Sequence, residues 1–130
     1  MSTDYARINI DDVEDLAAKF GMGELGEARY MREDVGADRI GLTYYRMNAG
    51  KRTGFGHRHR EAEEMYVVLS GSGRVKVDDD IIELREWDAI RFDQDAMRNV
   101  EAGPDGIEYL AFSAGNDSSD AEMTPGWWSE

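Results

Sequence analysis

The stretch GHRHREAEEMYVVLSG, residues 56–71, carries the strongest structural and chemical signal in this sequence. It contains the only two histidines of the chain, His57 and His59, two positions apart. In a β-strand, residues i and i+2 point to the same face, so both imidazoles can enter the interior of one barrel. In the run that follows, Glu64 and Tyr66 share a face. If the two strands are antiparallel, Glu64 can complete a three-ligand set.

Two imidazoles and one carboxylate are a donor set that suits a divalent transition metal. With open positions left over, the set is typical of non-haem Fe(II), and it also suits Mn, Ni, Cu or Zn. The alternative is a pair of surface histidines on an edge strand. Arg58 and Arg60 alternate with the histidines, as expected if the histidines point inward and the arginines outward. The sequence therefore predicts a metal site at His57, His59 and Glu64.

On both sides of this stretch the sequence predicts short β-strands. Runs rich in β-branched and aromatic residues lie at 39–48, 64–69, 74–77, 81–84, 89–92, 97–101 and 107–112. Segments typical of turns separate several of them, at 70–73, 78–80 and 103–106. Many short strands at a spacing of about 8–12 residues indicate an all-β sandwich or barrel.

The two ends of the chain differ from this pattern. Residues 11–20 are predicted to form a short helix, with Asp11 as its N-cap and Gly21 after its end. Residues 113–130 form a polar tail that contains Trp127 and Trp128. Each tryptophan can bury about 150–250 Å², so the pair is expected to pack either on the barrel's own outer face or on a second subunit.

Length and composition limit the classes of protein to consider. A chain of 130 residues fits one domain, and 41% apolar residues argue against disorder. No apolar run approaches the length of about 18 residues that would predict a membrane span, and no secretory signal is seen at the N-terminus. The net charge of −13 disfavours nucleic acid and anionic membranes as partners. Without cysteine there is no thiolate site or disulfide, and a cytoplasmic protein is the expectation.

The spacing within residues 56–71 resembles the first motif of the cupin superfamily. That motif has a His-x-His pair, then Glu after three or four residues, then Gly after about six more. Here Glu64 follows His59 after four residues, and Gly71 follows Glu64 after six. Gly50 precedes His57 by six residues, where the family motif has about five.

The second motif of the family is degenerate in this chain. The family's Gly, Pro, Gly, fourth-ligand His and Asn align with Trp87, Asp93, Asp95, Arg98 and Ala102. The resemblance covers roughly residues 39–112. It implies a cupin-type jelly-roll barrel of two antiparallel sheets that is often dimeric. On this view residues 1–130 form one domain, with a barrel core at about 27–112, the helix at 11–20 and the tail at 113–130.

Arg98 stands where the resemblance would place the fourth ligand. A guanidinium has donors only and stays protonated, so it cannot bind a metal ion. Three alternatives are open for it. Arg98 pairs bidentately with Glu64 and leaves a metal-free cavity, or it turns aside and binds an anionic substrate beside the ion, or it points to solvent or pairs with the surface acids. The hydroxyl of Tyr66 is a second candidate for substrate binding, with core packing as its alternative.

Two functions remain open, because the family's members range from dioxygenases, isomerases, epimerases and decarboxylases to sugar-binding regulators and storage proteins. The first is a metal-dependent enzyme, of the oxygenase or isomerase type, that acts on a small anionic organic molecule. The second is a small-molecule binding or sensing protein without turnover or a physiological metal. A homodimer is expected from the resemblance and from the tryptophan pair.

Overall fold

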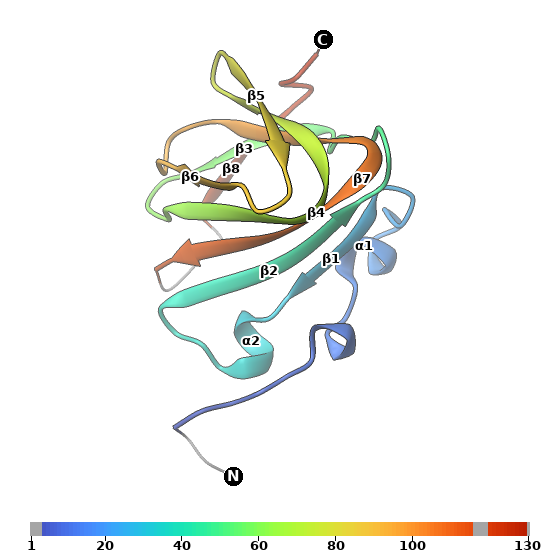
Figure 1. Ribbon diagram of the computed structural model, residues 1–130. Coiled ribbons are helices and arrows are strands. Elements are labelled where there is room, and N and C mark those ends of the chain that lie inside the picture. The colour runs from blue at the N-terminus through green and yellow to red at the C-terminus, as the bar shows by residue number, and fades with distance from the viewer. Residues whose placement is uncertain (1–3, 116–119, 130) are drawn as a thin grey trace.

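The computed structural model describes residues 4–115 and 120–129, and it confirms the all-β prediction (Figure 1). Its strands form one curled, barrel-like sheet in which every pairing is antiparallel. The strands are β1 (Gly26–Tyr30), β2 (Ile40–Met47), β3 (Phe55–His59), β4 (Glu64–Val77), β5 (Asp80–Arg85), β6 (Ala89–Phe92), β7 (Arg98–Ala114) and β8 (Ala121–Pro125).

The two long strands hold the sheet together. β7 pairs with β2, β3 and β4, while β4 also pairs with β5 and β6, so the strands on both sides of the barrel join through these two. Side chains alternate along β4, where Glu64, Tyr66 and Val68 are buried. Their cross-strand partners on β7 are buried as well, which places the apolar core inside the curl.

The segments 70–73 and 103–106 were predicted as turns, and this prediction was wrong. Both lie within continuous strands, β4 and β7, and the register of this pair shifts around them. Gly71 and Gly106 adopt positive φ angles of 76° and 78°. A Cβ atom on Gly71 would lie 2.1 Å from the carbonyl oxygen of Gly106. The glycines therefore allow two strands to bend while they remain paired.

A short N-terminal helix is present, but the predicted range 11–20 is divided. A 3-10 turn, η1 (Ile10–Asp12), precedes α1 (Leu16–Lys19), and the extended, buried Val13 separates them. Asp15 caps α1 instead of Asp11, and its carboxylate also accepts the backbone N–H of Ala28 in β1. One further helical turn, α2 (Arg32–Val35), was not predicted.

The C-terminal tail packs on the chain's own barrel. β8 pairs along β3, and the indole of Trp128 is buried beneath two arginines, with the guanidinium carbons of Arg52 and Arg74 4.0 Å and 5.1 Å from its ring centre. Lys76 lies over Trp127 at 4.5 Å. Across residues 4–115 and 120–129, no helix has the length and apolar character needed to span a membrane.

Candidate metal centre

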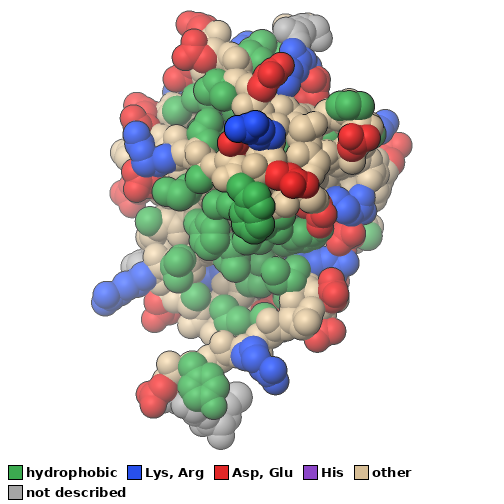
Figure 2. Space-filling view, in the orientation of Figure 1, with side chains coloured by type: hydrophobic (Ala, Val, Ile, Leu, Met, Phe, Trp, Pro, Cys, Tyr) green, Lys and Arg blue, Asp and Glu red, His purple; other side chains and the backbone are tan. Residues whose placement is uncertain are grey.

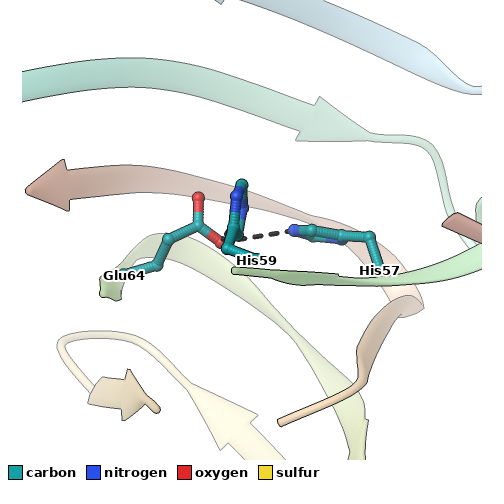
Figure 3. A group of neighbouring side chains, drawn as sticks. All are labelled: His57, His59 and Glu64. Atoms are coloured by element: carbon teal, nitrogen blue, oxygen red, sulfur yellow. Dashed lines mark hydrogen bonds and ion pairs between the residues drawn. The ribbon is translucent and has the colours of Figure 1, made fainter. Parts of the chain in front are cut away.

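The three predicted ligands come from two consecutive strands. His57 and His59 lie on β3, and Glu64 is the first residue of β4 after a four-residue connection. β3 is held on one side by β8 and meets β7 on the other through the pairing of His57 with Arg98. Both imidazoles and the carboxylate point toward one another (Figure 3). These three side chains therefore lie together, as their spacing in the sequence predicts.

The distances within this group suit a shared metal ion. His57 Nε2 lies 3.2 Å and His59 Nε2 lies 3.3 Å from Glu64 Oε1, and the three ligand atoms are within 4.8 Å of one another. Ligand atoms about 2.1 Å from an ion, at angles of about 90–110°, are about 3.0–3.4 Å apart. The two nitrogen–oxygen distances fall in that range, so these residues could hold an ion.

The imidazole rings of His57 and His59 lie in different environments. The His57 side chain is 24% exposed, whereas that of His59 is 4% exposed, so the group opens toward solvent on the His57 side. His59 Nε2 is buried and makes no hydrogen bond with any described residue. A buried imidazole nitrogen that has a lone pair and no hydrogen-bond partner is a free donor atom for a metal.

Asp120, which no sequence pattern indicated, binds the other nitrogen of His59. Its Oδ1 lies 2.8 Å from His59 Nδ1, while its Oδ2 accepts the backbone N–H groups of Glu61 and Ala62 at 2.7 Å and 3.1 Å. Partial burial raises the pKa of Asp120, but these three bonds outweigh it and bring the pKa to about 2. Asp120 follows His59 by 61 residues, so no local pattern connects the two.

Arg98 is fully buried beside the same group, so the alternative that it points to solvent is wrong. Its Nη2 donates a hydrogen bond to Glu64 Oε1, and its Nη1 donates to the carbonyl oxygen of Ala96 at 2.8 Å. The contact uses one carboxylate oxygen, so the pairing with Glu64 is not bidentate. Arg98 Nε is buried and has no hydrogen-bond partner among the described residues, which leaves one donor available.

The charges in the group keep Glu64 ionised. Burial alone would raise the pKa of Glu64, but its close contacts with His57, His59 and Arg98 outweigh it and hold the pKa well below its usual value. Burial likewise lowers the pKa of His59, but the carboxylates of Glu64 and Asp120 outweigh it and raise that pKa. An ionised carboxylate beside two imidazoles is the form of this donor set that binds a cation.

Tyr66 belongs to both the core and the site. Its ring packs 4.7 Å from that of Phe92 and 5.1 Å from that of Tyr109, while its hydroxyl lies 3.5 Å from Glu64 Oε1. Burial raises the pKa of Tyr66 well above its ordinary value, so the hydroxyl stays protonated and can donate. A cavity of about 230 Å³ borders Glu64, and Arg39 and Arg91 are among the residues that line it.

Comparisons with known proteins agree with this fold. Residues 43–105 match the family described as the cupin domain. A cupin protein from Bacteroides fragilis is similar in structure, with 23% identity, a TM-score of 0.72 and coverage of 91% of this chain and 89% of that one. No curated protein sequence matches the chain.

Oxalate decarboxylase from Bacillus subtilis is also similar in structure. It is 19% identical, with a TM-score of 0.75, and the match covers 89% of this chain but only 31% of that one. This chain therefore spans about a third of the decarboxylase's length. A further structure of that enzyme, 21% identical over 86% of this chain and 30% of that one, with a TM-score of 0.73, is described in terms of its Mn(II) centres.

Proposed function

Because this chain is a member of the cupin superfamily, we propose that it binds a divalent transition metal ion through His57, His59 and Glu64. The convergence of these three ligand atoms supports the proposal most directly. The buried Nε2 of His59 lies 3.3 Å from Oε1 of Glu64 and makes no hydrogen bond with any residue that the structure describes. A cation between the two atoms would satisfy both.

The proposed activity is that of a metal-dependent enzyme, of the oxygenase or isomerase type, acting on a small anionic organic molecule. The bound ion would supply Lewis acidity at its open positions. Arg98 would bind a carboxylate of the substrate through its Nε–H, which has no hydrogen-bond partner among the described residues, and the hydroxyl of Tyr66 would orient the molecule.

The second candidate is a binding or sensing protein that holds a small molecule without a metal. One observation favours it. The guanidinium of Arg98 already neutralises Glu64 at the oxygen that both imidazoles face. If that ion pair is stronger than metal coordination, the pocket stays metal-free.

Elemental analysis of the purified protein separates the two candidates. Near-stoichiometric metal in the wild type that is lost in the His57→Ala, His59→Ala double variant supports the metal site. The matched control is Arg58→Ala, Arg60→Ala, which changes the exposed Arg58 of β3 and the exposed Arg60 just after it and should retain the metal. Metal-free protein that also fails to take up added Fe, Mn, Ni, Cu or Zn would contradict the proposal and support the second candidate.

The structural neighbours suggest the first ligands to test. Mn(II) and oxalate are named for the decarboxylase, so Mn-loaded protein should be titrated with oxalate and other small carboxylates in a calorimeter. We expect binding that weakens in Arg98→Met and does not change in Arg85→Met, an exposed arginine on β5. Equal binding by the wild type and Arg98→Met would contradict the role of Arg98 in holding the anion.

We also propose that the chain forms a homodimer through the outer face of β2, β7 and β4. The register of these strands places Leu42, Phe112 and Met65 in one row, with Leu110 and Val67 in the next. Hydrophobic side chains gather across the middle of the face seen in Figure 2, where β2 and β4 lie. A hydrophobic patch that continues across three strands suits an isologous interface. In such an interface a two-fold axis brings the same patch of two subunits into contact.

A further inference from the structure

The segment Asp120–Trp128 is bound to both faces of the strand that carries the histidines. β8 pairs with β3 from Phe55 to His59. On the outer face, Glu122 accepts hydrogen bonds from Arg58 Nε and Arg60 Nε, both at 3.1 Å. On the inner face, the carboxylate of Asp120 reaches His59. In this segment, Asp120 contacts a proposed metal ligand, His59. Glu122 contacts Arg58 and Arg60, neither of which is a proposed ligand.

The hydrogen bonds of Asp120 determine where the proton of His59 lies. The backbone N–H groups of Glu61 and Ala62 can only donate, and they bind Oδ2 of Asp120. An ionised carboxylate can only accept, so its Oδ1 requires a proton on His59 Nδ1. A neutral imidazole carries one N–H, which leaves the lone pair on Nε2. Nε2 is the nitrogen that faces Glu64 at 3.3 Å.

We propose that Asp120 is a positioning residue of the metal centre, which presents the Nε2 lone pair of His59 to the ion by holding the proton on Nδ1. This inference rests on the proposed metal-binding function. A carboxylate that binds the far nitrogen of a ligating histidine fixes its ring orientation and makes the ligand more basic, and losing such a partner typically lowers metal affinity by roughly 10–100-fold.

The substitution Asp120→Asn distinguishes this role from simple packing. In the variant, the N–H groups of Glu61 and Ala62 still require an acceptor, so the amide oxygen takes the place of Oδ2. The amide NH₂ then takes the place of Oδ1 and donates to His59 Nδ1. The proton of the imidazole moves to Nε2, where it blocks the metal. The near-isosteric Asn should therefore impair metal binding more than Ala, which leaves the imidazole free to adopt either tautomer.

The first experiment measures the affinity for Zn²⁺ and Mn²⁺ by competition with a chromophoric chelator. Relative to the wild type, we expect a loss of roughly 10–100-fold in Asp120→Asn and a smaller loss in Asp120→Ala. The control Glu122→Gln weakens the same segment on the outer face and should leave the affinity unchanged. Wild-type affinity in Asp120→Asn, or a greater loss in Ala than in Asn, would overturn the proposal.

The second experiment needs no metal. The ¹⁵N chemical shifts of the His59 ring, measured on metal-free protein at about pH 9, above the ordinary imidazole range, report which nitrogen carries the proton. We expect Nδ1–H in the wild type and Nε2–H in Asp120→Asn. A wild-type ring protonated on Nε2 would overturn the role of Asp120. If the wild type binds no metal, the proposed function fails, and this measurement still decides whether Asp120 sets the tautomer.

Discussion

At the scale of single residues, Arg98 gives this site its particular character. It is buried opposite His57 on β7, at the position where the family motif has a fourth ligand, and its charge is directed at Glu64. The head group is also held by the carbonyl oxygen of Ala96, so Arg98 is fixed by the fold as well as by its ion pair. An arginine in this setting compensates the charge of Glu64 whenever no metal ion is bound.

Replacing Arg98 with Met should therefore make the protein's stability depend on metal. The change leaves Glu64 as a buried charge without its partner, which costs about 3–5 kcal/mol. A divalent ion at the site restores a positive charge, so adding Mn²⁺ or Zn²⁺ should raise the melting temperature of the variant more than that of the wild type. Thermal unfolding with and without the ion measures this difference. The exposed Arg91→Met is the control, and an equal gain in wild type and Arg98→Met would argue against metal binding at Glu64.

The sequence predicted those site residues whose placement depends on local geometry. The two-residue spacing of His57 and His59 fixes a common face in any strand, and Glu64 follows after a short connection, so their convergence needs little knowledge of the fold. The conformation of Arg98 depends on which carbonyls and rings surround it, and three alternatives stayed open. Asp120 was missed because its partner lies 61 residues away and acidic residues are common in this chain.

At the scale of the elements, the glycine-rich segments were misread because glycine serves two purposes. Positive φ angles are typical of tight turns, but they also permit a bulge in a strand that keeps its neighbours. Here β4 and β7 bend at the same level, and both strands continue past the bend. Composition alone does not separate these cases, since the difference lies in the pairing partner of each segment.

The substitution Gly71→Ala should be strongly destabilising at this bend. The residue has φ +76°, and the added Cβ would lie 2.1 Å from the carbonyl oxygen of Gly106. The left-handed conformation alone costs about 1–2 kcal/mol with a side chain, and the clash adds to it. Urea unfolding of the variant should therefore show a loss of about 2 kcal/mol or more. Gly54→Ala, whose Cβ meets no atom within 4 Å, should stay close to the wild type, and equal losses in both would refute the explanation.

A second element-scale prediction concerns the ion cluster that joins β4 and β7 to the tail. Glu101 accepts hydrogen bonds from Arg74 and Arg52, and Arg52 also donates to the carbonyl oxygen of Trp128 at 2.7 Å. Partial burial raises the pKa of Glu101, but the two arginines outweigh it and lower the pKa. The group therefore stabilises the fold above its unfolded pKa of about 4, and this contribution is lost as the pH falls through the lower folded value.

The variant Glu101→Gln should lose about 1 kcal/mol at neutral pH, and the deficit should shrink as the pH falls below about 4. Chemical denaturation at a series of pH values gives both quantities. The exposed Glu86→Gln serves as the control and should follow the wild type throughout. A deficit that stays constant down to the most acidic condition would show that the charge of Glu101 is not what stabilises the cluster.

At the scale of the whole molecule, the outer apolar face is the feature most relevant to assembly. Ile40 and Met65 on this face are 57% and 43% exposed in a chain whose net charge is −13. The cavity beside Glu64 is lined partly by these two residues, so a dimer formed here would place its opening at the subunit boundary. The tryptophans expected as an alternative interface pack within the chain instead.

The double substitution Ile40→Lys, Met65→Lys should convert the dimer to a monomer. Each subunit would then place two ammonium groups in an apolar interface, and desolvating them disfavours association. Sedimentation velocity at micromolar concentration should show a dimer for the wild type and a monomer for the variant. Ile82→Lys changes an exposed apolar residue on β5 and should remain dimeric. A monomeric wild type would contradict the proposed interface.

The anchoring of His59 by a distant carboxylate also bears on how the protein is made. The ribosome adds Asp120 61 residues after His59, so a nascent chain grown only to the end of β7 already holds His57, His59 and Glu64 without the group proposed to fix the tautomer of His59. Ions that bind at that stage meet a ring that is free to rotate. We expect tight loading to wait for the finished polypeptide, and stalled translation complexes released before and after residue 120 should differ in metal uptake accordingly.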